Sequence, residues 1–208
     1  MIVDHVTLVV DDDAATAHHF REAYGLGSRG GAYLDHLGAT STAVPLTPPQ
    51  SVEWLAVSDP AVAEGSPTGR MLLDALADGG GLVAWTVLVD DIDAVAARTG
   101  IAPYAGATRN TYTGTFRRWW TVTGAPHLPI FIAYDGPPHE RVERWQAAYD
   151  MVGHTCAPGG FARIEVGGDA AELDDWLGPH DLPVAVVDGP PGLRAVHVAT
   201  ANGPVVLR

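Results

Sequence analysis

The chain has 208 residues, of which 25 are acidic and 12 basic, so its formal net charge is −13 with histidine neutral. Hydrophobic residues make up 47% of the sequence and charged residues 18%, which predicts a buried core and argues against disorder. The negative charge argues against nucleic-acid binding, and no apolar run approaches the ~20 residues that cross a bilayer. Cys156 is the only cysteine, which excludes an internal disulfide and a cysteine-rich zinc site.

The first sixty residues predict the order β-α-β-β-β. Residues 2–10 form a strand-like segment with alternating faces, and Asp11-Asp12-Asp13 then caps a helix over 14–24. Three strands are expected at 33–37, 40–46 and 51–57. Because Met1 leads directly into the first strand without a basic segment, no signal peptide is predicted and the expected location is cytoplasmic.

The same order repeats later in the chain. A strand over 82–89, a cap at Asp91 and Asp93 and a helix over 94–98 precede strands at 107–112, 115–123 and 129–134. The segment HVTLVVDDDAA from His5 superposes on WTVLVDDIDAV from Trp85 with an offset of 80 residues, which indicates an internal duplication. A further helix is expected at 71–77, between the two copies.

The last part of the chain predicts a third such unit after a connector helix over 140–150. It contains a strand over 162–166, a helix over 169–177 and strands at 183–187, 193–200 and 204–207. The prediction is therefore a single α+β domain made of a first module (1–59), a second module (82–136) and a third, C-terminal βαβββ-like unit (161–208). The paired modules form a curved, cup-shaped mixed sheet with helices on the outside and a cavity on the concave face.

The segments VDHVTLVVDDDAATAHHF, GGAYLDHLGATSTAVPL and VEWLAV resemble the first module of a glyoxalase-like domain of the vicinal oxygen chelate superfamily. The later RRWWTVTGAPHLPIFIAYD and GGFARIEVGG are similar to the remainder of that group. The resemblance implies an open cup in which a divalent metal chelates vicinal oxygens of a substrate. Reactions in this superfamily include isomerisation, lyase chemistry, epimerisation and ring-cleaving dioxygenation, and some members only sequester drugs, so the fold does not determine the function.

The resemblance places His5 and Glu53 at the metal-ligand positions of the first module and offers His36 as a third ligand. Two histidines and one carboxylate suit zinc, iron, manganese or nickel. Trp85 and Ile130 match the corresponding positions of the second module and supply no ligand, so the usual site is incomplete. Glu53 is alternatively a catalytic base, or the partner of His5 or an arginine in a structural contact.

Aromatic and basic side chains are expected to form the wall of the substrate site. The candidates are Trp54, Trp85, Arg118, Trp120, Tyr134 and His154. On a strand, Arg118 and Trp120 share one face while Arg117 and Trp119 share the other, and the sequence leaves open which pair lines the cavity. No phosphate loop or dinucleotide fingerprint occurs, so no nucleotide cofactor is expected.

Two functions follow from these observations. The first is an enzyme of the lyase, isomerase or dioxygenase type, with or without one divalent metal, that acts on a small carbonyl- or hydroxyl-bearing metabolite, including aromatic ones. The alternative is a metal-free protein that binds or sequesters a small molecule. Either form is compatible with a homodimer, and neither has a nucleic-acid or membrane partner.

Overall fold

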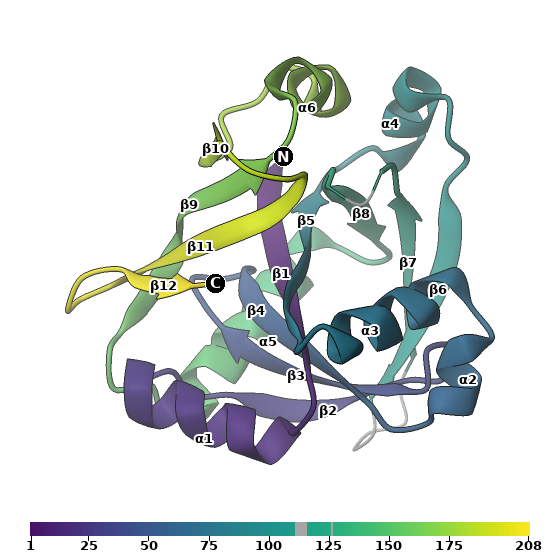
Figure 1. Ribbon diagram of the computed structural model, residues 1–208. Helices are drawn as coiled ribbons and strands as arrows, with labels where there is room; N and C mark the ends of the chain where they lie inside the picture. Colours follow the sequence, from purple (N-terminus) through teal and green to yellow (C-terminus); the bar gives the residue numbers. More distant parts are fainter. Residues whose placement is uncertain (111–115, 126) are drawn as a thin grey trace.

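Two β-sheets organise the chain, which the computed structural model describes over residues 1–110, 116–125 and 127–208 (Figure 1). The strands of the larger sheet are β1 (Ile2–Val10), β2 (Arg29–Leu34), β3 (Ala39–Pro45), β4 (Ser51–Val57), β5 (Gly81–Leu88), β6 (Tyr104–Asn110), β7 (Phe116–Val122) and β8 (Ile130–Tyr134). The strands of the smaller sheet are β9 (Pro158–Gly167), β10 (Val184–Val187), β11 (Gly192–Thr200) and β12 (Val205–Leu207). The helices are α1 (Asp13–Tyr24), α2 (Pro60–Glu64), α3 (Pro67–Ala77), α4 (Ile92–Thr99), α5 (Pro138–Met151) and α6 (Ala170–Leu177).

The larger sheet is a closed barrel with the strand order β1-β4-β3-β2-β6-β7-β8-β5. Each predicted module supplies four adjacent strands, and the two modules meet through the antiparallel pairs β1–β5 and β2–β6. The pairs β1–β4 and β5–β8 are parallel, so the sheet is mixed, and the predicted α+β fold of paired modules is confirmed. Pairing of β2 with β6 closes the predicted cup, because it joins the two strands that would otherwise be free edges.

The repeated aspartate motif has a capping role in the helices of all three units. The carboxylates of Asp12, Asp91 and Asp169 each accept a backbone N–H at the start of α1, α4 and α6. Both α1 and α4 end at a glycine in the left-handed conformation, Gly25 at φ 69° and Gly100 at φ 72°. The similarity of the two sequence segments therefore comes from equivalent strand–cap–helix units.

Several observed elements differ from the predicted ones. Strand β2 starts at Arg29 rather than at residue 33, because the Gly30-Gly31 pair lies inside the strand and not in the preceding loop. Helix α3 starts at Pro67 rather than at residue 71, since the Ser66 hydroxyl accepts the Gly69 N–H and proline is well suited to the first helical position. Helix α2 was not predicted from the sequence.

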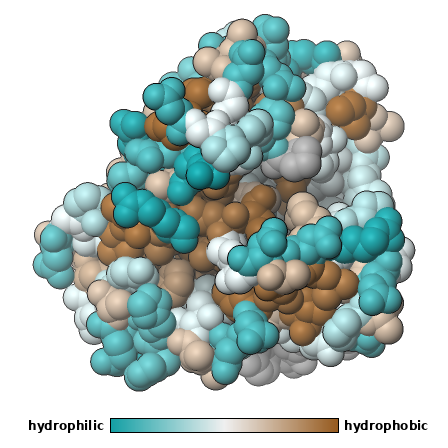
Figure 2. Space-filling view, in the orientation of Figure 1, coloured by the Kyte–Doolittle hydropathy of each residue, from teal (hydrophilic) through white to brown (hydrophobic). Residues whose placement is uncertain are grey.

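The third unit forms its own sheet, in the order β10-β9-β11-β12, instead of widening the barrel. Strand β11 packs against β5, and apolar residues of both sheets belong to one buried cluster that includes Val6 and Trp85 from the barrel and Ile164 and Val196 from the second sheet. Figure 2 shows apolar atoms gathered between this sheet and α3. Within the described residues, no helix is both long enough and apolar enough to span a bilayer.

Candidate functional site

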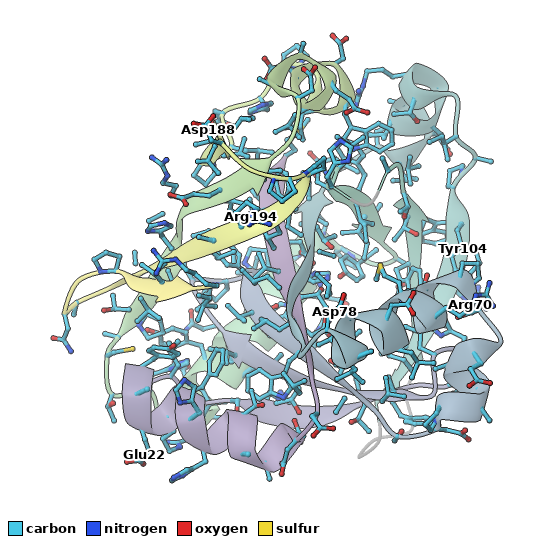
Figure 3. All side chains as sticks on the ribbon, in the orientation of Figure 1. Glu22, Arg70, Asp78, Tyr104, Asp188 and Arg194 are labelled. Carbon is cyan, nitrogen blue, oxygen red and sulfur yellow. The ribbon has the colours of Figure 1, made fainter. Side chains whose placement is uncertain are left out.

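The barrel encloses a cavity of about 1110 Å³, and strand alternation decides which side chains face it. On β4, Glu53 and Leu55 line the cavity, whereas Val52 and Trp54 are fully buried on the outer side of the barrel. Tyr104, which is 58% exposed and is labelled in Figure 3, lines one part of the cavity. Trp119 lines the same part, and the two ring centroids are 5.9 Å apart. The interior therefore combines charged, hydroxyl-bearing and aromatic groups.

Two consecutive residues of β1, Asp4 and His5, both line this cavity. The register between β1 and β5 pairs Val3 with Val87 and His5 with Thr86, so β1 contains one extra residue at this point. An extra residue of this kind interrupts the alternation of side chains and redirects a neighbour to the same face. Asp4 consequently joins the interior instead of the apolar face to which regular alternation would assign it.

Asp4 is fully buried and is the centre of a polar network. Its Oδ2 accepts hydrogen bonds from His5 Nδ1 at 2.8 Å and from the Tyr134 hydroxyl at 3.0 Å. Its Oδ1 accepts from Arg141 Nη2, and the Arg141 guanidinium lies 4.0 Å from the centroid of the Tyr134 ring. These contacts satisfy a buried carboxylate that would otherwise be strongly destabilising.

The network also determines the charge state of its members. Burial alone would raise the pKa of Asp4, but the hydrogen bond from His5 and the charges of His5 and Arg141 outweigh burial and lower it. Burial alone would lower the pKa of His5, but its hydrogen bond to Asp4 and the charges of Glu53 and Asp4 raise it. Burial and the Asp4 charge raise the pKa of Tyr134, which keeps its hydroxyl protonated as a donor.

Glu53 faces the second nitrogen of His5 across the cavity wall. Its Oε2 lies 3.6 Å from His5 Nε2, beyond a normal hydrogen bond, while its Oε1 accepts the hydroxyl of Ser41. The two residues are 48 positions apart in sequence but come together because β1 and β4 are parallel neighbours, with Thr7 opposite Glu53. An imidazole nitrogen and a carboxylate oxygen thus point into the same space.

Helix α5 supplies a further wall of the cavity, although the sequence had indicated only a connector helix on the outside. The lining residues Glu140, Arg141, Arg144, Trp145 and Ala148 share one helical face, and the helix packs against β3. Sequence reasoning missed Asp4, Ser41, Arg141 and Trp145. A charged residue beside His5 in an apolar strand was the available signal for Asp4, whereas nothing local indicated where α5 would pack.

A family model described as a glyoxalase-like domain matches residues 3–179. The chain belongs to this family. Its fold is that of the vicinal oxygen chelate superfamily, in agreement with the resemblance seen in the sequence. No curated protein sequence matches the chain.

Solved structures with a similar fold include methylmalonyl-CoA epimerases. The Streptomyces coelicolor enzyme in complex with 2-nitronate-propionyl-CoA has 18% identity and a TM-score of 0.46, over 64% of this chain and 94% of that chain. The enzyme from Mycobacterium tuberculosis has 18% identity and a TM-score of 0.47, over 66% of this chain and 89% of that chain. At this identity the likeness concerns the fold and not the substrate.

The glyoxalase-like family implies a metal ion, and the second module shows whether its donors are present. Thr86 lies opposite His5. His5 pairs with Ser51 on β4, and Glu53 is two residues after Ser51. In the same way Thr86 pairs with Ile130 on β8, and Ile132 is two residues after Ile130. The cavity-facing equivalents of His5 and Glu53 are therefore Thr86 and Ile132. The sequence alignment had matched Trp85 and Ile130 instead, and the extra residue in β1 accounts for the shift from Trp85 to Thr86.

His36 does not complete a metal site either. It lines the cavity, and its ring lies beside that of Trp119, with the two centroids 6.1 Å apart. Among the described residues, no group of three or more His, Cys, Asp or Glu side chains is arranged to hold a metal ion. The predicted set of His5, His36 and Glu53 is thus not assembled, and this donor set does not fit the family's metal.

The structure places Trp54 and Trp85 in the core and not in the cavity, contrary to the sequence prediction. The Trp54 indole donates to Asp13 Oδ1 at 2.6 Å and packs against Phe20, with ring centroids 5.0 Å apart. Trp85 is 1% exposed, in the cluster between the two sheets. Both residues are neighbours of inward-facing residues on their strands, so alternation directs them to the outer face of the barrel.

On β7, Trp119 lines the cavity, whereas Arg118 and Trp120 do not. The Trp119 ring covers Gly106, where a Cβ would overlap with ring atoms, and its indole donates to Thr108 Oγ1 at 3.0 Å. The prediction that Arg118 and Trp120 contact the substrate is therefore not supported by their placement. The Arg117 side chain lies outside the described part of the chain.

Of the remaining predicted residues, Tyr134 lines the cavity and His154 does not. His154 Nδ1 accepts the backbone N–H of Gly27 at 3.0 Å, and its ring stacks near Tyr149 with centroids 4.8 Å apart. This histidine joins the loop after α5 to the loop before β2. It borders a separate, smaller hollow, so its position indicates a structural role.

Proposed function

We propose that this protein is an enzyme that moves a proton on a small carbonyl- or hydroxyl-bearing molecule, in a reaction of the isomerase or lyase type. The observation that carries the proposal is the Asp4–His5 pair, which directs His5 Nε2 toward the Glu53 carboxylate inside a large cavity. A site that only stores an apolar molecule has no need for four ionisable groups in contact, namely Asp4, His5, Tyr134 and Arg141, of which Asp4 and Arg141 are buried. Ionisable side chains that contact one another in a cavity and have shifted pKa values are typical of catalytic sites.

The geometry supports a division of roles between Glu53 and His5. Ser41 holds Oε1 of Glu53, which leaves Oε2 to accept a proton from the carbon next to a substrate carbonyl. The electrons of that C–H bond move to the carbonyl oxygen, where the protonated His5 imidazolium donates its Nε2–H as a hydrogen bond to the developing negative charge. Return of the proton from Glu53 to the same or a neighbouring carbon completes the exchange.

Asp4 and Arg141 position His5 in this scheme. The Asp4 carboxylate fixes Nδ1 of His5 as a donor, so Nε2 faces the cavity, and Arg141 neutralises the remaining charge of Asp4. Each step uses only groups of this chain, and no step requires a metal ion. An imidazole nitrogen and a carboxylate oxygen such as those of His5 and Glu53 can also bind a metal ion, so metal content is measured alongside activity.

The test is hydrogen–deuterium exchange at carbon, followed by NMR in D2O for a panel of small carbonyl compounds. Glu53→Gln is expected to reduce exchange ~10²–10⁴-fold while ligand binding is retained. The matched control is Glu165→Gln, because Glu165 pairs with Arg163 and His197 on the second sheet, outside the cavity. Elemental analysis of the same samples reports whether metal accompanies activity.

The alternative function, binding without chemistry, gives a different result. In that case a compound of the panel binds the unmodified protein and Glu53→Gln with equal affinity, and no carbon-bound proton exchanges with either. Equal exchange rates for the unmodified protein and Glu53→Gln would contradict the assignment of Glu53 as the base.

A further inference from the structure

A second polar position in the cavity, Arg29, takes no part in the network around Asp4. Arg29 is the first residue of β2, is partly buried and lines the same cavity. Within the described part of the chain its guanidinium has no ion pair, hydrogen bond or ring contact, whereas Arg141 in the same cavity is paired with Asp4. A partly desolvated arginine without a counterion favours the arrival of an anion.

The register of the barrel relates Arg29 directly to Glu53. Arg29 lies opposite Ala43 on β3, and Ala43 lies opposite Glu53 on β4. All three residues line the cavity, so they form one row across its wall. Adjacent strands are about 4.8 Å apart, so the backbones of Arg29 and Glu53 are separated by roughly 10 Å.

Small residues leave this row open between the two charged side chains. Ala43 carries only a methyl group, and the cavity wall on β2 continues after Arg29 with Gly30, Gly31 and Ala32. Arg29 and Glu53 do not form an ion pair with each other across the intervening space. A molecule lying over Ala43 would therefore contact the guanidinium at one end and the carboxylate of Glu53 at the other.

Of the described residues, four acidic ones line the cavity, and one of them, Asp135, follows β8, which β6 and β7 separate from β2. Asp4 is neutralised by Arg141, and Glu53 faces His5. Glu140 is at the start of α5. Arg29 lies near the other end of this helix, because it is two residues from Gly27, and Gly27 packs against Val152 just beyond the end of α5. Val152 follows Glu140 by twelve positions, which correspond to roughly 18 Å of helix, so Glu140 is distant from Arg29.

We propose that Arg29 binds an oxyanion group, a carboxylate or a phosphate, of the molecule whose carbonyl end lies beside Glu53 and His5. The inference rests on the proposed function for the role of Glu53, and it narrows the substrate class to anionic carbonyl compounds. A planar guanidinium forms two parallel hydrogen bonds with such a group, which gives orientation as well as affinity. Arg29 would then decide which end of the substrate reaches Glu53.

The experiment measures binding of malonate and of inorganic phosphate by calorimetry at low ionic strength. The protein carries a net charge of −13, so nonspecific anion binding is disfavoured and saturable binding reports a defined site. Arg29→Gln is expected to weaken binding of the preferred anion roughly 10- to 100-fold, and Arg29→Lys is expected to restore part of it. The control is Arg194→Gln, because Arg194 is exposed on β11 (Figure 3).

The outcomes separate this inference from the proposed function. Tighter binding of malonate assigns a carboxylate to the substrate, and tighter binding of phosphate assigns a phosphate ester. Equal affinities in the unmodified protein and Arg29→Gln, or no saturable binding of either anion, would overturn the role of Arg29 even where Glu53-dependent exchange is observed. Conversely, Arg29-dependent anion binding without Glu53-dependent exchange would retain the anion site and reject the proposed reaction.

Discussion

The two modules of the barrel have the same backbone plan but different cavity-facing side chains. The first module presents His5, Ser41 and Glu53, whereas the equivalent positions of His5 and Glu53 in the second module are Thr86 and Ile132. Their outer faces remain alike, since Trp54 in the first module and Phe131 in the second are fully buried. The comparison teaches that capping and outer packing maintain the duplicated fold, while the inner row is free to diverge and here places an imidazole and a carboxylate in the first module.

The largest expected effect is on stability, through the charged network at the junction of the two halves. Asp4→Asn removes the counterion of buried Arg141 and the acceptor that fixes His5, and it should reduce the free energy of unfolding by about 3–5 kcal/mol. Denaturant unfolding measures the change. Asp188→Asn is the control, because Asp188 is an exposed aspartate in the turn between β10 and β11, and its effect should stay within about 0.5 kcal/mol (Figure 3).

A loss below about 1 kcal/mol for Asp4→Asn would show that the network is not an essential link between the modules. The double variant Asp4→Asn with Arg141→Met sharpens the result. If the cost arises from the unpaired guanidinium, the double variant should be more stable than Asp4→Asn alone.

The next expected effect concerns the missing ligands of the second module. Thr86→His combined with Ile132→Glu places two further donors opposite His5 and Glu53, which makes a four-donor set on the cavity wall. Zinc at about 100 times its dissociation constant should then stabilise the variant by roughly 2.7 kcal/mol. Thermal or denaturant unfolding with and without zinc measures the shift, and calorimetry gives the affinity.

The unmodified protein is the control for that experiment, because the described residues contain no set of three or more ligands. If zinc stabilises the unmodified protein as much as the double variant, the absence of donors at Thr86 and Ile132 does not limit metal binding, and the prediction is wrong. Ile132→Glu alone is expected to destabilise the protein, since it adds a carboxylate to the cavity without a second imidazole.

The smallest effect is a pH dependence that arises from His5. Its pKa is raised in the folded state by Asp4 and Glu53, so its stabilising contribution is present below the unfolded pKa of about 6.5 and is lost as pH rises through the folded pKa. His5→Asn should therefore cost more stability near pH 6 than near pH 9. Denaturant unfolding of both proteins at several pH values measures the difference.

Asp188→Asn, measured at the same pH values, is the control for general effects of pH and net charge. A cost of His5→Asn that grows between about pH 6 and pH 9 would have the wrong sign, and it would show that His5 is neutral in the folded protein. The contribution of Asp4 to stability has the opposite pH dependence. Because its pKa is lowered in the folded state, this contribution is present above the ordinary carboxyl pKa and is lost as pH falls through the folded pKa.

Much of the site on β1 and β4 could be predicted from the sequence, because strand alternation is a local property. It correctly separates Glu53 and Leu55 from Val52 and Trp54, and for the same reason it argues against Trp54 as a cavity residue. Alternation could not choose between Trp119 and Trp120, since either face of β7 is compatible with the pattern. Closure of the barrel and the ring of Trp119 over Gly106 decide that question.

The sequence by itself determined the βαβββ order, the aspartate caps and the pairing of His5 with Glu53 as candidates, since these depend on neighbours a few residues apart or on a family pattern. Only the tertiary structure decided that Asp4 turns inward, that Thr86 faces His5, that α5 brings Arg141 into the cavity and that the third unit forms a separate sheet. The physical reason is that burial of a charge depends on partners far away in the chain. Asp4 and Arg141 are 137 residues apart, and no local pattern records their contact.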